Sequence, residues 1–177
     1  AYSTAPQAEL QWNSTLTFSH YKNEVNELLG DLTINGDISL NDSNQNITLT
    51  RVGEPVGMFY GYKVEGLFRT TEDFQGAAIQ FGRPFEDALF GTTWLGDIKY
   101  QDINNDGVID NDDRTVIGNP HPDFTFGFQN SLSYKNFDLS VFLQGSYGND
   151  IFNAVDRTLT AANLYYVNQS PSVLDYW

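Results

Sequence analysis

The sequence predicts an all-β fold: an antiparallel segment of a large transmembrane β-barrel with long extracellular loops. Apolar and polar residues alternate with period 2 in three segments, whereas helical periodicity is almost absent from the 177 residues. The polar faces of these segments carry Ser, Thr, Gln, Asn and Gly, with very few charges. Two of the segments are about eleven residues long, which is the length with which a tilted strand crosses a bilayer.

The clearest alternation predicts a β-hairpin with strands near residues 123–134 and 137–148, joined by Lys135 and Asn136 as a two-residue turn. In a barrel the apolar face meets lipid and the small polar face lines the lumen. We therefore expect one set of side chains to face lipid: Phe124, Phe126, Phe128, Leu139, Val141 and Leu143. The lumen set contains Gln129, Ser131, Ser140 and Gln144, and Phe142 falls in the same register.

A third alternating segment predicts a strand near residues 9–21. A soluble β-sandwich alternates in the same way and hides its apolar face in a core, so the pattern has two interpretations. The polar face of a soluble sheet usually presents Lys and Glu, and the scarcity of charges here favours the barrel. The apolar face of this strand contains Leu10, Trp12, Leu16 and Phe18, and the polar face contains Gln11, Asn13, Thr15, Thr17 and Ser19.

The lengths of the connections predict an orientation in the membrane. Bacterial barrels have short periplasmic turns and long extracellular loops. The turn at Lys135 and Asn136 then marks the periplasmic side, and the segments 22–122 and 149–177 are extracellular. A connection as long as the first of these is unusual in a compact domain and is usually functional.

Composition excludes several classes of function. The net charge of −14 argues against nucleic acid and against an anionic membrane surface as partners, because both need clustered Lys and Arg. The absence of cysteine excludes disulfide frameworks and thiolate metal sites. No apolar run is long enough for a transmembrane helix.

Residues 102–113 follow the calcium-loop pattern of an EF-hand. A hard cation takes six to eight oxygen ligands at about 2.3–2.6 Å, and a tight loop turns alternate residues inward. We expect a structural Ca²⁺ ion, with Asp110 as a further ligand, direct or through water. The predicted ligands are the side chains of Asp102, Asn104, Asp106 and Asp113 and the backbone carbonyl of Val108, with Gly107 at the sharp turn.

A solvated acidic loop is the alternative, because Asp, Asn and Gly are ordinary turn formers. The flanks of the loop do not resemble EF-hand helices. The segment 96–100 before it is strand-like, and 115–120 after it leads quickly into a turn. We therefore expect the loop to brace β structure and not to open helices as a sensor does.

The sequence predicts no enzyme. Its two histidines, His20 and His121, are far apart, and no nucleophile, base and acid come together in the pattern. The aromatic residues of the long segment have two interpretations: stacking on sugar rings, or packing of the loops against each other. These residues are Phe59, Tyr60, Tyr62, Phe68 and Trp94.

Five segments follow one another along the chain: Lys22–Leu28, Arg51–Tyr62, Gly96–Gly107, Asp113–Gly127 and Phe137–Gly145. Together they resemble the C-terminal part of the SusC/RagA-type TonB-dependent outer-membrane transporters of Bacteroidetes-like bacteria. The likeness is collinear from about Trp12 to Asn153. On this resemblance, residues 1–177 are expected to be a fragment of the C-terminal barrel domain, without the plug domain or the TonB box.

The resemblance implies a barrel of about 22 strands with a plugged lumen, in the outer membrane of a Gram-negative bacterium. It implies import of oligosaccharides or peptides with energy from TonB, and a SusD-like surface lipoprotein as the lid. The alternative is a soluble secreted β module with a dockerin-like calcium loop, used for adhesion or assembly. A dockerin carries a second copy of the loop, and this chain has one.

Overall fold

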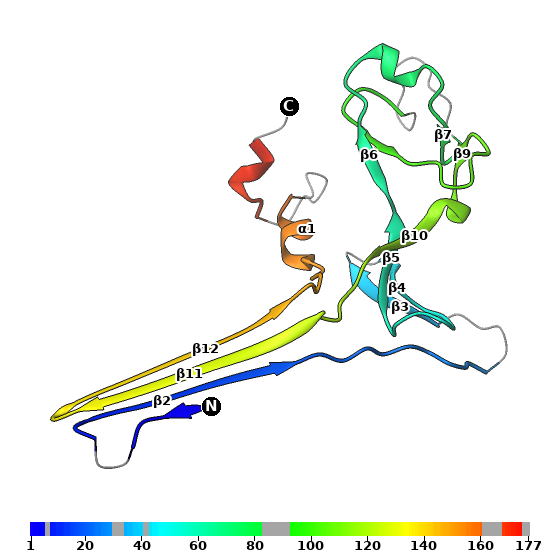
Figure 1. The fold of residues 1–177 in the computed structure, drawn as a ribbon. Helices are drawn as coiled ribbons and strands as arrows, with labels where there is room; N and C mark the ends of the chain where they lie inside the picture. Colours follow the sequence, from blue (N-terminus) through cyan, green and yellow to red (C-terminus); the bar gives the residue numbers. More distant parts are fainter. Residues whose placement is uncertain (6–7, 30–33, 41–42, 83–92, 161–167, 175–177) are drawn as a thin grey trace. The chain divides into compact units, whose positions relative to one another are not determined.

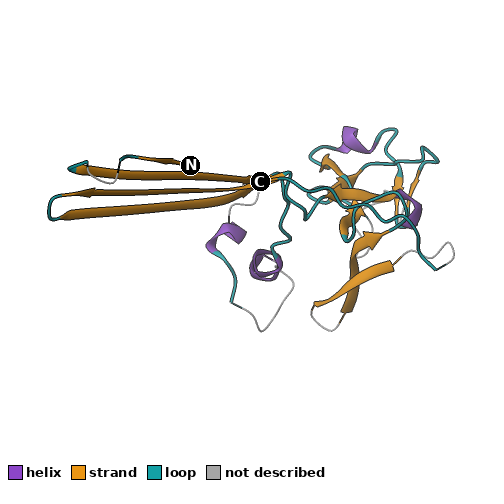
Figure 2. Ribbon diagram, turned by 60° about the horizontal axis from the view of Figure 1, so that its bottom comes forward, coloured by secondary structure: helices purple, strands orange, loops and turns teal. Residues whose placement is uncertain are grey.

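The computed structural model describes residues 1–5, 8–29, 34–40, 43–82, 93–160 and 168–174 (Figure 1). The chain divides into two compact units. One contains Ala1–Phe59 and Gly118–Asp150, and the other contains Tyr60–Ile117 and Ile151–Trp177. Strands predominate among the described residues (Figure 2). The helical elements described are α1 (Ala154–Thr160) and three 3-10 turns: η1 (Thr71–Phe74), η2 (Asn111–Asp113) and η3 (Pro171–Leu174).

A four-stranded antiparallel sheet forms much of the first unit. The strands stand in the order β1 (Tyr2–Ser3), β2 (Leu10–Ser19), β11 (Phe124–Tyr134) and β12 (Phe137–Tyr147). Phe126 of β11 lies opposite Phe18 of β2 on one side and opposite Gly145 of β12 on the other. This sheet confirms the predicted antiparallel, all-β fold. In the described residues the sheet is open and does not close into a barrel.

A two-residue turn joins β11 to β12. Tyr134 pairs with Phe137, so Lys135 and Asn136 complete the hairpin at the positions that the sequence predicts. Lys135 has φ 54°, in the left-handed region that the first central residue of such a turn requires.

The register separates the sheet into two faces, because residues directly opposite each other point to the same side. Val141 and Leu143 lie opposite Asn130 and Phe128, on the apolar face. Ser140 and Gln144 lie opposite Ser131 and Gly127, on the polar face. Each face also holds exceptions: Asn130 and its partner Ser14 lie on the apolar face, and Phe142 lies on the polar face.

Strands also occur in the segment 22–122, where the sequence predicts a long extracellular connection with a strand-like stretch at 96–100. The strands Ile34–Leu40 and Ser43–Thr50 have polar sequences containing Gly or Asn, with weak β propensity, and the other strands of this segment are too short for alternation to reveal them. One sheet has the order β10 (Arg114–Gly118), β5 (Met58–Tyr62), β4 (Ser43–Thr50) and β3 (Ile34–Leu40). Two further pairs are antiparallel β6 (Val64–Leu67) with β8 (Ile98–Tyr100), and parallel β7 (Ile79–Gln80) with β9 (Val108–Ile109).

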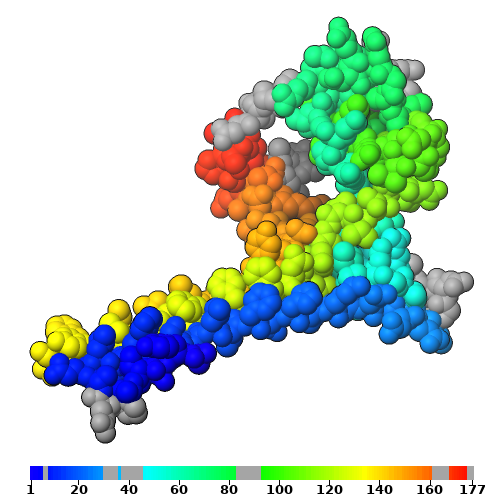
Figure 3. Space-filling model, viewed as in Figure 1, coloured from blue at the N-terminus to red at the C-terminus, as the bar shows by residue number. Residues whose placement is uncertain are grey.

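The two units bury apolar side chains very differently. In the second unit Phe68 is 1 % exposed and Ile109 is 0 % exposed. In the first unit the apolar face of β2, β11 and β12 stays exposed, with Leu16 at 67 % and Leu139 at 58 %. Figure 3 shows the side chains of these strands, blue and yellow, as uncovered surface. Soluble proteins rarely expose so large an apolar patch unless it contacts a partner or a membrane.

Among the described residues, no helix is both long enough and apolar enough to cross a membrane.

Candidate functional site

The acidic loop 102–113 is ordered by its own side chains. The carboxylate of Asp102 accepts hydrogen bonds from the backbone N–H of Asn105 at 2.6 Å and of Gly107 at 2.8 Å. Asn104 Oδ1 accepts from the N–H of Asp106 at 2.9 Å, and Asp106 Oδ1 accepts from that of Val108 at 2.8 Å. These bonds turn the chain tightly, so the first three predicted ligands project from consecutive turns of one loop.

Gly107 provides the conformation that this loop needs. Its φ is 85°, in the left-handed region where a residue without a Cβ is favoured. A Cβ at this position would meet no atom within 4 Å, so backbone conformation and not space explains the glycine.

Asp113 closes the loop from a fully buried position, with 0 % of its surface exposed. Its two carboxylate oxygens accept from the N–H of Ile103 at 2.8 Å and of Asp110 at 2.9 Å. The Asp110 N–H lowers the pKa of the Asp113 carboxyl below its ordinary value, against the opposing effect of desolvation. The carboxylate is therefore held in its charged form inside the protein.

The loop is supported by a strand, as the sequence predicts. Ile109 pairs with Gln80 in the parallel β7–β9 pair. The Ile109 carbonyl accepts from the N–H of Phe81, and the Gly107 carbonyl accepts from that of Ile79, each at 2.9 Å. No sequence signal predicts the partner strand, because β7 has two residues.

A second contact joins the end of the loop to β5. The guanidinium carbon of Arg114 lies 4.5 Å from the ring centre of Tyr60 and 5.9 Å from that of Tyr62. The Tyr62 hydroxyl donates to Asn111 Oδ1 at 3.3 Å. Burial raises the pKa of the Tyr62 phenol, and the nearby Arg114 opposes that rise. The loop therefore contacts β7 through Ile109 and β5 through Arg114 and Asn111.

All five predicted ligands lie within this loop, as their positions in the sequence require. Within the described part of the chain, however, no three His, Cys, Asp or Glu side chains are grouped so as to hold a metal ion. The carboxylate oxygens point instead to backbone N–H groups, as an acidic loop without an ion also allows. Calcium binding therefore stays a prediction.

Most of the aromatic residues considered for sugar stacking pack against other rings. Phe68 stacks on Phe74 with ring centres 4.7 Å apart, and Phe74 stacks on Trp94 at 5.7 Å. Tyr62 contacts the rings of Phe81 and Tyr100, each at 5.3 Å. These contacts favour the packing interpretation.

Both histidines bond to backbone carbonyls. His20 Nδ1 lies 2.5 Å from the carbonyl oxygen of Asp123, and His121 Nε2 lies 2.7 Å from that of Val56. These contacts link His20 to the residue that precedes β11, and His121 to the segment that precedes β5.

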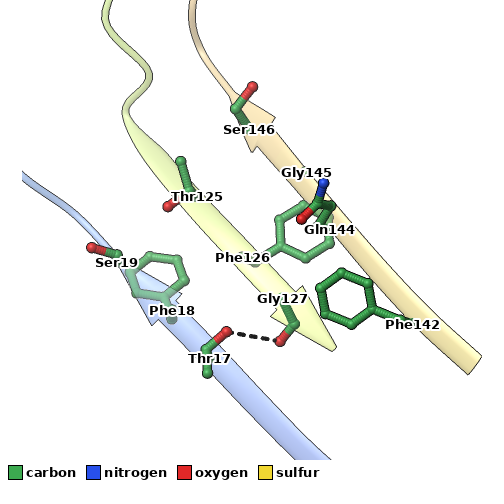
Figure 4. Close-up of a pocket in the computed structure, with 10 residues that line it drawn as sticks. All are labelled: Thr17, Phe18, Ser19, Thr125, Phe126, Gly127, Phe142, Gln144, Gly145 and Ser146. Atoms are coloured by element: carbon green, nitrogen blue, oxygen red, sulfur yellow. Dashed lines mark hydrogen bonds between the residues drawn. The ribbon is translucent and has the colours of Figure 1, made fainter. Parts of the chain in front are cut away.

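The polar face of the first sheet holds a hollow that the sequence does not reveal (Figure 4). Its volume is about 570 Å³, and β2, β11 and β12 line it. Phe142 stands in the hollow beside Gly127 and Gln144. The remaining lining residues are Thr17, Ser19, Thr125 and Ser146 of the polar face, together with Phe18, Phe126 and Gly145, whose register belongs to the apolar face.

Comparison with known proteins gives the class. No family model matches the chain. TonB-dependent receptor P26 of Formosa agariphila is 37 % identical over 146 residues, covering 80 % of this chain and 13 % of the receptor. TonB-dependent receptor P3 of the same species is 31 % identical over 175 residues, covering 96 % and 16 %. TonB-dependent receptor SusC of Bacteroides thetaiotaomicron is 24 % identical over 149 residues, covering 81 % and 13 %.

The alternating antiparallel strands and these relatives together define the class as that of the TonB-dependent receptors. Within the class, the chain belongs to the SusC-type family, as the resemblance of its motifs predicts. It spans 13–17 % of the length of the curated relatives that it matches.

Proposed function

We propose that this chain contributes wall strands to an outer-membrane importer of oligosaccharides or peptides in a Gram-negative bacterium. The observation that carries the proposal is the register of β2, β11 and β12, which gathers an exposed apolar face on one side and a largely uncharged polar face on the other. A barrel wall needs these two faces, since one side meets lipid and the other lines the lumen.

The open edges of this sheet support the same proposal. A sheet edge in lipid leaves N–H and C=O groups without partners, at a cost of several kcal/mol per group. The strands therefore need neighbouring strands of the same barrel to cross the membrane. The soluble β module with a dockerin-like loop is the less favoured function, because it would leave the apolar face of Leu16 and Leu139 in water.

TonB and a SusD-like surface lipoprotein are the proposed partners. The support is the naming of the relatives: all those compared above are TonB-dependent receptors, and one is SusC itself. In this proposal TonB supplies the energy from the periplasm and the lipoprotein closes the barrel from outside. The segment 22–122 lies on the outer side and forms part of the surface that the lid meets.

Calcium is the proposed structural ion of the loop 102–113. The support is the match of six loop positions, the buried charged carboxylate of Asp113 and the strand that anchors Ile109. An ion there would order the outer segment and would take no part in chemistry.

Uptake by cells tests the proposed import. The full-length gene is deleted in the source bacterium and restored on a plasmid, and uptake of labelled oligosaccharide and peptide mixtures is measured. We expect the deletion to abolish uptake of one of the two mixtures and the plasmid to restore it. Collapse of the proton-motive force should abolish the restored uptake. Unchanged uptake of both mixtures in the deletion strain would contradict the proposal.

A further inference from the structure

The side chain of Gln80 acts as a piece of strand between β7 and β8. Its Nε2–H donates to the Ile98 carbonyl at 3.0 Å, and its Oε1 accepts from the Tyr100 N–H at 2.9 Å. These two bonds reproduce the pattern that a backbone residue makes with a parallel neighbouring strand, where it bonds to residues two apart. Gln80 is 4 % exposed, so water has little access to the amide group. The amide therefore extends the β6–β8 pair by one side chain.

The backbone of the same residue belongs to the β7–β9 pair, which Figure 1 shows side by side. Gln80 lies opposite Ile109, and the N–H groups on either side of Gln80 donate to carbonyls of the acidic loop at 2.9 Å. β8 ends at Tyr100, two residues before the loop 102–113 begins, and β9 lies inside that loop. Gln80 therefore holds the entry of the loop through its side chain and the middle of the loop through its backbone.

The segment 71–81, here called the strap, is anchored by an aromatic ring near each end. Near its start, Phe74 stacks on Phe68 with ring centres 4.7 Å apart, and Phe68 is 1 % exposed. At its end, the ring of Phe81 lies 5.8 Å from that of Tyr100. Phe81 has φ 52°, a left-handed conformation that a bulky residue keeps only where its surroundings hold it. The strap is therefore fixed on both sides of the loop that it supports.

We propose that Gln80 is a positioning residue that couples the acidic loop to the strap, so that the loop and the strap open as one unit. The inference goes beyond the proposed structural ion, because it concerns the loop before any ion binds. Without the Gln80 amide, the Ile98 carbonyl and the Tyr100 N–H would lose these partners in a partly buried place, and the entry of the loop would separate from its middle. A contact that displaces the strap would then also open the loop.

Hydrogen exchange of the wild-type full-length protein tests the coupling. The protein is kept in detergent micelles with a calcium chelator, and urea is raised in small steps below the unfolding transition. The amides of Tyr100, Phe81 and Gly107 report the side-chain bond, the β7–β9 pair and the loop, respectively. We expect all three to lose protection with the same dependence on urea, because they open together. Exchange of Gly107 at a urea concentration that leaves Tyr100 protected would overturn the coupling.

Gln80→Met tests the residue itself, because it removes both side-chain bonds and keeps an unbranched side chain that tolerates burial. Gln101→Met is the matched control, since Gln101 is an exposed glutamine that immediately follows β8. We expect Gln80→Met to lower the protection of Asn105 and Gly107 by about tenfold, and Gln101→Met to leave it within about twofold. Protection in β11 and β12 should stay unchanged, which separates the coupling from a general loss of the fold. A change confined to Tyr100 would limit Gln80 to local packing and overturn the proposal.

Discussion

Trp12 and Asn130, 118 residues apart in the sequence, are joined by a hydrogen bond on the apolar face of the long sheet. The indole Nε1–H donates to the amide Oδ1 of Asn130 over 3.1 Å. Asn130 lies opposite Ser14 and Val141, so it interrupts a face that is otherwise rich in Phe, Leu and Val. In lipid, an amide oxygen without a partner is costly, and the indole provides that partner.

Replacing the indole tests this pairing. We expect Trp12→Phe to lower the free energy of unfolding by about 1 kcal/mol through the lost hydrogen bond, because it keeps an aromatic ring but removes the donor together with the pyrrole ring. In an Asn130→Leu background the same replacement should cost much less. Urea unfolding of the full-length barrel in vesicles, run as a double-mutant cycle, measures the difference. Equal costs in both backgrounds would show that the hydrogen bond contributes nothing.

The two faces make a second prediction. Val141→Arg places a charge on the proposed lipid face near the middle of the strand and should cost about 2–4 kcal/mol. Ser140→Arg is the matched control, one residue away on the opposite face, where water and polar groups accommodate the charge. The same vesicle assay compares the two variants. A larger loss for Ser140→Arg than for Val141→Arg would mean that the assigned faces are reversed.

Gly145 gives a prediction about packing on the apolar face. A Cβ there would lie 2.7 Å from Cε1 and 2.8 Å from Cζ of Phe126, which crosses over it from the neighbouring strand (Figure 4). Gly145→Ala should therefore displace the ring and cost about 1–3 kcal/mol.

Gly66→Ala is the matched strand control, because a Cβ at Gly66 meets no atom within 4 Å. Unfolding of the full-length protein compares the two glycine replacements. If Gly145→Ala is no more destabilising than Gly66→Ala, the Phe126 ring moves aside without loss.

The sequence predicts those parts of the fold that depend on regular alternation. The strand faces and the turn at Lys135 follow from period-2 patterning and from loop length. The hydrogen bond of Asn130 could not be predicted in this way, because one polar residue in an apolar row does not indicate its partner, which is 118 residues away. The pairing of Ile109 with Gln80 could not be predicted either, because a two-residue strand is too short to show alternation.

The acidic loop is likewise predictable from the sequence only in part. Its spacing predicts which side chains would hold an ion, whereas in the structure the oxygens of Asp102, Asn104 and Asp106 accept hydrogen bonds from backbone N–H groups of the same loop. The complete burial of Asp113 could not be predicted, because spacing along the chain does not show how the loop packs in three dimensions. The hollow at Phe142 also depends on three strands meeting in register, and its residues come from three distant parts of the sequence.

Calcium binding is the prediction that decides the role of this loop. In the intact protein we expect one Ca²⁺ per chain at a modest Kd of about 10⁻⁴–10⁻³ M, the range of extracellular modules. Mg²⁺ should compete weakly, because it prefers a strict octahedron and keeps its waters. Asp106→Ala should abolish the binding measured by calorimetry, since it removes one of the three alternating side-chain ligands.

Asp112→Ala is the matched control, because Asp112 lies within the same loop but outside the predicted ligand set. It removes the same charge and should leave calcium affinity within about twofold of wild type, since only general electrostatic attraction changes. Hydrogen exchange should show that calcium protects residues 96–120 in wild type and in Asp112→Ala, but not in Asp106→Ala. Equal uptake by Asp106→Ala and wild type, or none by wild type, would leave the loop as a solvated acidic turn held by its backbone hydrogen bonds.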